Sequence, residues 1–290
     1  MTVTLDVHRP TAVVTGASSG IGRATAHRLV ALGWRVIGVG RDPRRCAAAE
    51  REIAGGGDGF TMLRGDFTLM SEVIRVASEI RSLTTGLDVL INNAGGVRDR
   101  RIVTAEGAEA TFAANHLAPF LLTRELLPLL RGTAAARRPR SVRVIAVAST
   151  AHRASKGMNW RDLQGLETFH AGGAYVQAKL ANILFTRELA RRVAAEGIVA
   201  QVMHPGVVAT NFATYGDPAL RAHLAASVQV APDEPAETLV WLATDPAAGR
   251  GSGRYFHRKR EEIPAEVARD DDAAGRLWVE TEKLLSAMGC

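Results

Sequence analysis

The chain has 290 residues, 47% of them hydrophobic and 23% charged, and its 36 basic and 30 acidic side chains leave a formal net charge of +6. This length and composition are typical of one soluble α/β domain, and the two cysteines, Cys46 and Cys290, are too few for a disulfide framework or a zinc cluster. We expect both cysteines to be free thiols in a reducing compartment.

Charge and hydropathy exclude two further classes of protein. The basic clusters at residues 98–101, 137–143 and 258–260 are scattered and have no interleaved aromatic side chains, so we expect no nucleic-acid partner. No apolar run approaches the roughly 18 residues of a transmembrane helix, and residues 1–10 hold no apolar segment typical of a signal peptide. The sequence therefore predicts a cytoplasmic protein with no membrane span.

Apolar β-branched runs alternate with helical patterns from the start of the chain. We expect strands at residues 11–15, 35–39, 60–63, 88–91, 142–148 and 198–203, and a last strand that ends near residues 255–256. We expect helices at residues 21–32, from 43 onward, and at 69–83, 105–130, 174–195, 233–243 and 273–285. This order predicts a parallel sheet with helices on both faces, which binds ligands beyond the carboxyl ends of its strands.

A glycine-rich turn follows the first expected strand and opens the first helix. Its spacing is G-x-x-x-G-x-G, which permits a tight turn and close approach of the backbone to a pyrophosphate at a helix N-terminus. A glycine turn without a ligand is the plainer alternative. We expect a dinucleotide site made by Gly16, Ser18, Ser19, Gly20, Ile21 and Gly22.

The end of the second expected strand indicates which dinucleotide binds. A carboxylate here would hold the ribose hydroxyls of NAD(H), but this chain has Arg41, and Arg23 directly follows the glycine turn. Two guanidinium groups can clamp a 2′-phosphate, so the sequence favours NADP(H) over NAD(H). Asp42 could face the ribose instead, although we favour its role as the N-cap of the next helix. Asp66 is well placed for the adenine amino group, and we include its neighbour Phe67 in the cofactor site.

Tyr175 and Lys179 lie four residues apart at the start of an expected helix, so the phenol and the ammonium share one face. Asn-Asn-Ala-Gly at residues 92–95 follows the fourth strand, and Ser149 follows the fifth. With these motifs and the glycine turn, the chain resembles the short-chain dehydrogenase/reductase superfamily over residues 10–285.

Further segments are similar to the retinol-dehydrogenase-like branch of that superfamily: NHLAPFLLT at residues 115–123, KLANILFTRELA at 179–190, HPG at 204–206 and SGRYF at 252–256. The long connection between Ser149 and Tyr175, residues 150–174, also matches that branch. The resemblance implies a single-domain α/β protein over residues 1–290, with a Rossmann-type doubly wound sheet of about seven strands. It also implies interconversion of a carbonyl and its alcohol.

The resemblance assigns roles to the matching residues. Tyr175 would be the general acid in reduction and the base in oxidation, and Lys179 would bind the nicotinamide ribose and lower the pKa of the phenol. Ser149 would hold the substrate oxygen, and Asn115 a water that links Lys179 to solvent. His116, His152 and His204 show no metal spacing, and we expect no metal site. The nicotinamide side is expected against Asn93, Ala94, Gly95, Pro205, Gly206, Val208 and Thr210.

Two segments, residues 150–174 and 211–231, are expected on the substrate side. Their apolar side chains indicate a bulky lipophilic or aromatic ketone or aldehyde, and simple surface packing is the alternative. The side chains in question are Met158, Trp160, Leu163, Leu166, Phe169, Phe212, Tyr215, Leu220 and Leu224.

The leading hypothesis is an NADP(H)-dependent short-chain oxidoreductase that acts as a reductase. The alternative is a non-catalytic NADP(H)-binding sensor, against which the presence of Asn115, Ser149, Tyr175 and Lys179 argues. A light-dependent pigment reductase is a third option, disfavoured because no cysteine lies between Ser149 and Tyr175. A homo-oligomer paired through the helices expected at 105–130 and 174–195 and a monomer are equally compatible with the sequence.

Overall fold

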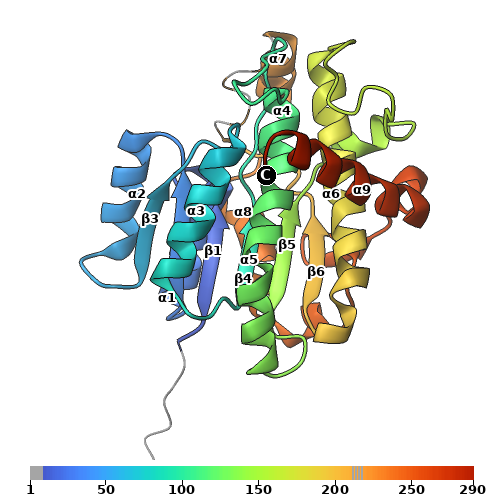
Figure 1. The fold of residues 1–290 in the computed structure, drawn as a ribbon. Coiled ribbons are helices and arrows are strands. Elements are labelled where there is room, and N and C mark those ends of the chain that lie inside the picture. Colours follow the sequence, from blue (N-terminus) through green and yellow to red (C-terminus); the bar gives the residue numbers. More distant parts are fainter. Residues whose placement is uncertain (1–8, 211, 213, 215, 217) are drawn as a thin grey trace, which may run out of the picture.

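An open sheet forms the centre of the computed structural model, which describes residues 9–210, 212, 214, 216 and 218–290. Within these residues the sheet has eight strands in the order β3-β2-β1-β4-β5-β6-β7-β8 (Figure 1). All neighbours pair in parallel except β7 and β8. The strands are β1 (Thr11–Thr15), β2 (Arg35–Gly40), β3 (Phe60–Arg64), β4 (Val89–Asn92), β5 (Arg143–Val147), β6 (Val199–Met203), β7 (Arg254–His257) and β8 (Arg260–Glu262).

The central strands are apolar runs because helices cover both of their faces. Every residue of β1, β4, β5 and β6 is buried. The strand order reverses between β1 and β4, which leaves a crevice beyond the carboxyl ends of these two strands. The predicted doubly wound α/β sheet is therefore confirmed, with eight strands rather than about seven.

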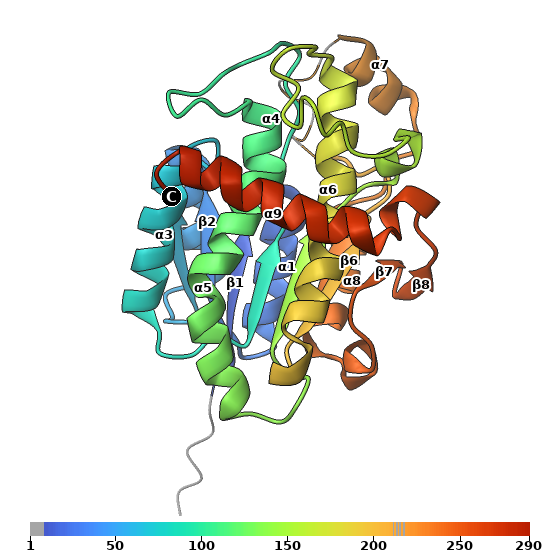
Figure 2. The same cartoon turned by 45° about the vertical axis from the view of Figure 1, so that its right-hand side comes forward.

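Two helical layers enclose the sheet. Helices α1, α2 and α8 pack with one face, and α3, α5 and α6 pack with the other, as Figures 1 and 2 show. None of the helices in the described part of the chain combines the length and apolarity that a membrane crossing requires. The α-helices are α1 (Gly20–Ala31), α2 (Pro43–Ala54), α3 (Met70–Leu83), α4 (Ala110–Phe112), α5 (Ala118–Ala135), α6 (Ala171–Arg192), α7 (Pro218–Ala226), α8 (Asp233–Thr244) and α9 (Asp271–Ala287).

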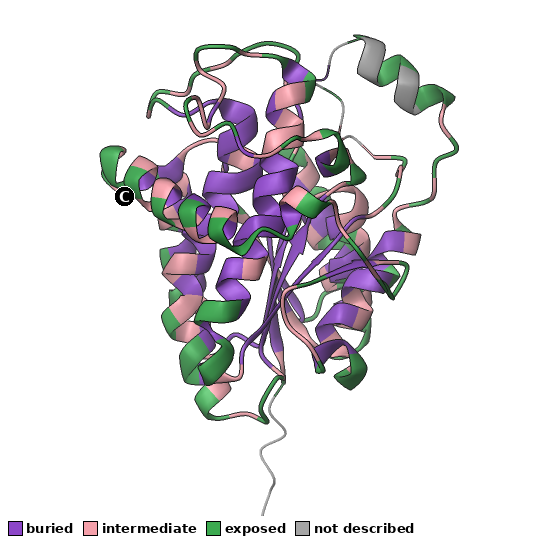
Figure 3. Ribbon diagram, turned by 90° about the vertical axis from the view of Figure 1, so that its right-hand side faces the viewer, coloured by how far each residue is buried: buried purple, intermediate pink, exposed green. Residues whose placement is uncertain are grey.

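Short helical turns connect these elements. A π-helical turn, Ala113–Leu117, joins α4 to α5, and the 3₁₀ turns are Thr150–Ala154, Ala194–Glu196, Pro246–Gly249 and Glu266–Ala268. Figure 3 shows the buried sheet and inner helix faces, with α7 standing apart from them. Cys46 and Cys290 are free thiols, as predicted, whereas the cytoplasmic location stays a prediction.

Three elements differ from their expected bounds or number. The helix expected at residues 105–130 begins only at Ala110, because Glu109 caps it by accepting from the N–H groups of Thr111 (3.0 Å) and Phe112 (2.8 Å). Helix α6 begins three residues earlier than expected, because His170 accepts from the N–H of Gly173 (3.1 Å). Strand β8 was not expected, since Arg-Glu-Glu has no apolar alternation. It pairs antiparallel through a two-residue turn at Arg258 and Lys259, both at positive φ.

Helix α9 crosses the outer face of α5 and α6 (Figure 2). The Trp278 ring lies 4.7 Å from the ring of Phe120 in α5 and 5.8 Å from that of Phe185 in α6, between centroids. Beneath them, His116 Nε2 and Thr281 Oγ1 are 2.8 Å apart, and burial lowers the pKa of His116 to about 3. Helix α9 thus covers the part of the outer face of α5 and α6 around Phe120 and Phe185.

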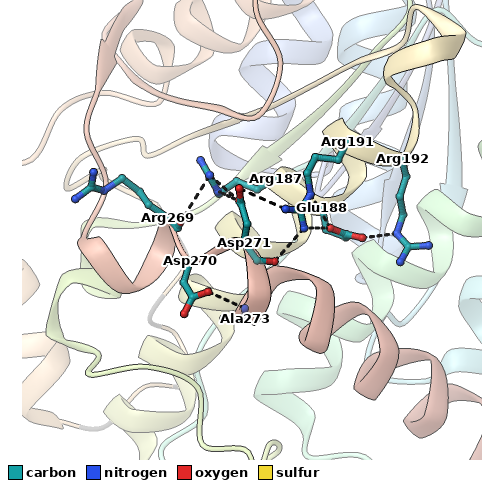
Figure 4. Close-up of polar contacts among 8 residues, drawn as sticks. All are labelled: Arg187, Glu188, Arg191, Arg192, Arg269, Asp270, Asp271 and Ala273. Atoms are coloured by element: carbon teal, nitrogen blue, oxygen red, sulfur yellow. Dashed lines mark hydrogen bonds and ion pairs between the residues drawn. The ribbon is translucent and has the colours of Figure 1, made fainter.

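Ion pairs fasten the first turn of α9 to α6 (Figure 4). Arg187 Nη2 lies 2.7 Å from Asp271 Oδ1, and Arg191 Nη1 lies 3.3 Å from Asp271 Oδ2. Glu188 pairs with Arg191 and with Arg192 on the same helix. Asp270 caps α9 by accepting from the N–H of Ala273 (2.9 Å).

Candidate active site

The turn between β1 and α1 is built for close approach of an anion. Gly16 and Gly20 have φ of +72° and +55°, which favours glycine. A Cβ at Gly16 would lie 2.7 Å from Asn93 Nδ2, and one at Gly22 would collide with the carbonyl oxygen of Gly16. Ser19 is the N-cap of α1 but its side chain makes no capping bond, and the first turn has no acidic residue. The helix N-terminus therefore presents N–H groups and positive potential that fit a pyrophosphate.

The loop after β4 is fastened across the crevice to the end of β1. Thr15 Oγ1 accepts from the N–H groups of Asn93 and Ala94, both at 2.9 Å, and Asn93 Nδ2 donates to the Thr15 carbonyl at 2.8 Å. Asn92 is instead a structural residue, because its Nδ2 donates to Thr123 Oγ1 (3.0 Å) in the core. The two expected halves of the cofactor site, residues 16–22 and 93–95, are thus brought together.

The segment after β6 covers the same crevice. Gly206 has φ of +77°, and Thr210 reaches the start of α1, where its Cγ2 lies 3.0 Å from the position that a Cβ of Gly20 would take. Val208 forms a parallel bridge with Val230. Pro205, Gly206, Val208 and Thr210 therefore run along the crevice that the turn of β1 and the loop of β4 line.

Charged side chains line the other end of the crevice, beyond β2 and β3. They surround a cavity of about 410 Å³ lined by Arg41, Arg64, Asp66, Glu72 and Arg75. Arg75 Nη2 is held by Glu72 Oε2 at 2.8 Å and donates to the Arg64 carbonyl at 2.6 Å. Arg64 was missed from the sequence; it is the last residue of β3 and pairs in register with Gly40, directly before Arg41.

Arg23, the other arginine of the expected clamp, pairs with an acidic side chain of α2. Its Nη1 forms an ion pair with Glu52 Oε2 of α2 at 3.2 Å, whereas Arg41 lines the cavity with Arg64. Asp42 is the N-cap of α2, as we favoured, because its Oδ1 accepts from the N–H of Arg45 at 2.8 Å. That bond lowers the pKa of Asp42.

Asp66 and Phe67 follow β3 at the edge of this cavity. Asp66 Oδ1 accepts from the N–H (3.0 Å) and the hydroxyl (2.9 Å) of Thr68, which fixes the carboxylate. The Phe67 side chain is buried in the core that covers the α3 face of the sheet. Only the backbone of Phe67 is therefore available to a ligand.

Ser149 and Tyr175 meet beyond the end of β5. Ser149 Oγ accepts from the N–H of Ala151 at 3.2 Å, and the Ser149 hydroxyl lies beside the Tyr175 phenol. Burial raises the pKa of Tyr175 to about 12, and the hydrogen bond with Ser149 opposes this shift. A lowered pKa was expected for Tyr175. In the protein without its cofactor, desolvation has the larger effect and raises this pKa.

Lys179 lies one helical turn further along α6 and is 4% exposed. Its Nζ donates to the Val147 carbonyl at 2.9 Å and lies 5.6 Å from the centroid of the Tyr175 ring. Burial lowers the pKa of Lys179 to about 7. The predicted neighbourhood of phenol and amine is therefore present, with both pKa values displaced by desolvation.

Asn115 sits inside the π-helical turn between α4 and α5 and is fully buried. Its Nδ2 donates to the carbonyls of Gly96 and Thr111, both at 2.7 Å, and its Oδ1 accepts from the N–H of Gly96 at 3.3 Å. A Cβ at Gly95 would collide with Asn115 Oδ1 and would lie 3.6 Å from Lys179 Nζ. Asn115 thus sets the path of residues 95–96 next to Lys179, and π turns of this kind occur often at functional sites.

His152 supports Ser149 and was not singled out from the sequence for that role. The buried ring donates from Nδ1 to the Ser149 carbonyl at 2.7 Å and accepts at Nε2 from the N–H of Ala265 at 3.1 Å. Burial lowers the pKa of His152, which favours this neutral form. The backbone of Ser149 is therefore tied to the segment before α9, a contact that no local sequence pattern signals.

The two expected substrate-side segments have different surroundings. The Phe212 ring lies 5.0 Å from the Tyr175 ring, between centroids. Met158, Trp160 and Leu163 pack against the core instead, and the Arg276 guanidinium lies 4.3 Å from the Trp160 ring. Tyr215 and the side chains of Leu220 and Leu224 lie outside the described residues. Of the residues that are described, Phe212 is thus the apolar side chain placed directly at the phenol.

Known proteins resemble this chain in sequence and in fold. The family model described as short chain dehydrogenase matches residues 10–219. Retinol dehydrogenase 14 of Mus musculus is 36% identical, over 97% of this chain and 87% of that protein. The putative daunorubicin C-13 ketoreductase DnrU of Streptomyces sp. (strain C5) is 34% identical, over 92% of this chain and 90% of that protein. The solved Pseudomonas aeruginosa RhlG/NADP active-site complex superposes with a TM-score of 0.69 at 27% identity, over 90% of this chain and 97% of that one.

Proposed function

The chain belongs to the short-chain dehydrogenase/reductase superfamily, in its retinol-dehydrogenase-like branch, and we propose that it is an NADP(H)-dependent reductase of a bulky lipophilic or aromatic ketone or aldehyde. The observation that carries this proposal is the meeting of Ser149, Tyr175 and Lys179 beyond β5, next to a glycine turn shaped for a pyrophosphate.

The preference for NADP(H) is supported by the charged cavity beyond β2 and β3. Arg64 pairs in register with Gly40, the residue before Arg41, and the two guanidinium groups suit a phosphate that carries a charge near −2. The Asp42 carboxylate caps α2 by accepting from the N–H of Arg45. Its partner is therefore the helix and not the ribose of NAD(H). A solved neighbour of 27% identity was obtained with NADP, which supports the same choice.

The nicotinamide, when bound, supplies the hydride, and the protein supplies a proton and position. We propose that the Tyr175 hydroxyl donates its proton to the carbonyl oxygen of the substrate and that the Ser149 hydroxyl donates a hydrogen bond to the same oxygen. Lys179 would bind the nicotinamide ribose, near the loop that Asn115 positions. His152 would hold the backbone of Ser149 in place for this contact.

A protonated phenol is compatible with reduction, the direction that we propose. Because burial raises the pKa of Tyr175 to about 12, the phenol carries its proton throughout the neutral range and is ready to donate it. Oxidation of an alcohol would require the phenolate at the start, which burial disfavours.

The substrate class is supported by the apolar ring at the reacting centre. The Phe212 ring lies against the Tyr175 ring, with centroids 5.0 Å apart. A relative of 34% identity carries the name putative daunorubicin C-13 ketoreductase, and daunorubicin is a bulky substrate with aromatic rings. We therefore propose an aryl or polycyclic ketone in place of a small polar carbonyl.

The test is oxidation of NADPH and of NADH, followed by absorbance, against a panel of aryl ketones, polycyclic ketones and long aldehydes. We expect turnover with NADPH, and in Tyr175→Phe a loss of about 10²- to 10⁴-fold in turnover with unchanged NADPH affinity. NADPH binding without turnover of any panel member by the wild type would instead favour the sensor. Full turnover by Tyr175→Phe would overturn the proposed proton donor.

A further inference from the structure

Three side chains that the proposed reaction does not use lie together at the edge of the sheet formed by β6, β7 and β8. His204 directly follows β6, His257 is the last residue of β7, and Glu262 is the last residue of β8. One nitrogen or oxygen atom from each lies within 4.8 Å of the others. Their positions in the sequence form no metal-binding pattern, because the sheet brings them together from three strands.

The distances within this cluster are near those of a coordinated ion. His204 Nε2 lies 3.2 Å from Glu262 Oε2. Two ligand atoms on one tetrahedral Zn²⁺ lie about 3.3–3.5 Å apart, given bonds of about 2.0–2.2 Å. The His257 ring lies 4.0 Å from the His204 ring between centroids, at an interplanar angle of 10°. The ligand atom of His257 lies within 4.8 Å of those of His204 and Glu262.

The hydrogen bonding of His257 fixes which of its nitrogens is available. Its Nδ1 lies 3.1 Å from the carbonyl oxygen of His204. A carbonyl oxygen only accepts, so Nδ1 carries the proton and Nε2 of the neutral ring presents its lone pair. Metal-binding histidines use this arrangement, in which the second ring nitrogen donates to a carbonyl or carboxylate.

The cluster is closed on one side and open on the other. His204 is 5% exposed and stacks on the Tyr255 ring, with centroids 5.3 Å apart, and its Nδ1 has no hydrogen-bond partner. The Glu262 side chain is 37% exposed and gives access from solvent. Arg153 Nη2 lies 4.0 Å from Glu262 Oε2, so an entering cation would compete with this guanidinium for the carboxylate.

We propose that His204, His257 and Glu262 bind a divalent transition-metal ion of the zinc class, with water at the remaining position. Two imidazoles and one carboxylate suit Zn²⁺, Co²⁺, Ni²⁺ and Cu²⁺, whereas Mg²⁺ and Ca²⁺ prefer oxygen ligands alone. The ion would join the ends of β6, β7 and β8 immediately before the segment that begins at Pro205. This inference does not depend on the proposed reaction.

The test uses the untagged, metal-stripped chain, titrated with Zn²⁺ by calorimetry and with Co²⁺ by visible absorption. We expect one saturable site with the intense bands of tetrahedral Co²⁺, and no binding of Mg²⁺. His257→Ala and Glu262→Gln should each weaken Zn²⁺ binding by about tenfold or more. His27→Ala, at an exposed histidine of α1, is the matched control and should bind as the wild type does.

Equal Zn²⁺ affinity in the wild type, His257→Ala and Glu262→Gln would overturn the proposal, because the ion would then sit at other groups. Failure of the folded wild type to saturate below about 1 mM Zn²⁺ would also overturn it. Circular dichroism of each variant shows that it is folded. Glu262→Gln keeps the side-chain shape at a half-exposed position, so it remains informative even where His257→Ala does not fold.

Discussion

The two ends of the cofactor crevice differ in how far water reaches their ionisable side chains. At the proposed adenosine end, charged side chains from β2 and β3 surround an open cavity, and Arg75 is held there by Glu72 and Glu79. At the proposed nicotinamide end, Tyr175 and Lys179 have been taken out of water, and their pKa values lie near 12 and 7. Water can screen the charges at the first end but not at the second.

This difference indicates where the molecule sacrifices stability for function. A charge at the open end changes which ligand is preferred and has little effect on folding, since exposed pairs contribute little. Lys179 at the closed end opposes folding whenever its amine is charged, because folding removes it from water. The predictions below separate these two kinds of residue.

Lys179→Met should have the largest effects, since it should lower turnover and raise the free energy of unfolding. Turnover should fall by about 10²- to 10⁴-fold, because the group proposed to bind the nicotinamide ribose is lost. The free energy of unfolding at pH 7 should rise by about 2–4 kcal/mol, because a buried amine becomes apolar. Steady-state kinetics and denaturant unfolding check the two effects. A less stable variant would contradict the view that burial of Lys179 opposes folding.

Arg64→Ala and Arg41→Ala should each weaken NADPH binding by about 10- to 100-fold and leave NADH binding unchanged, since each removes a charge-assisted bond to the 2′-phosphate. Fluorescence titration of the reduced cofactors measures both affinities. Arg23→Ala is the matched control, because Arg23 pairs with Glu52, and it should change NADPH affinity less than about threefold. A larger loss of NADPH affinity in Arg23→Ala than in Arg64→Ala would show that Arg23 contributes to binding of the 2′-phosphate.

The stability difference between Lys179→Met and the wild type should depend on pH. The pKa of Lys179 is about 7 in the folded chain, against an ordinary value of 10.5. Between these values the unfolded chain binds a proton that the folded chain does not, so the wild type gains stability as pH rises, by about 1.4 kcal/mol per pH unit. The advantage of Lys179→Met should therefore shrink above pH 7. A constant difference from pH 7 to pH 9 in urea unfolding would show that the amine is not desolvated.

Asp42→Ala, at the open end of the crevice, should have the smallest effect on stability and none on cofactor affinity. Loss of the N-cap of α2 should lower the midpoint of thermal unfolding by about 2–3 °C. The affinities for NADPH and NADH should stay as they are, because the carboxylate caps the helix. A selective loss of NADH affinity would identify Asp42 as a reader of the ribose.

The sequence was most informative where a pattern is local. The strands β1, β4, β5 and β6 are buried apolar runs, and the glycine turn and the Tyr175–Lys179 spacing lie within single connections. The α/β sheet and the proximity of Tyr175 and Lys179 could therefore be predicted from the residues themselves, whereas the place of Ser149 beside them followed from the family resemblance.

What the sequence did not reveal depends on contacts between distant residues. Arg64 reaches the cavity because of its register with Gly40, and His152 supports Ser149 only because Ala265, 113 positions away, supplies its second partner. Arg23 was expected in the clamp but meets Glu52 of a neighbouring helix. The raised pKa of Tyr175 in the protein without its cofactor could not be predicted either, since the extent of desolvation is set by packing and not by spacing.

Helix α9 has a consequence for the chain while it is being made. Because α5 and α6 precede α9, they leave the ribosome first, and the apolar face with Phe120 and Phe185 stays uncovered until Trp278 has been synthesised. A nascent or truncated chain without residues 271–287 would therefore expose an adhesive surface and would depend on chaperones during that interval. In the folded chain Trp278 packs on Phe120 and Phe185 and covers this part of the face.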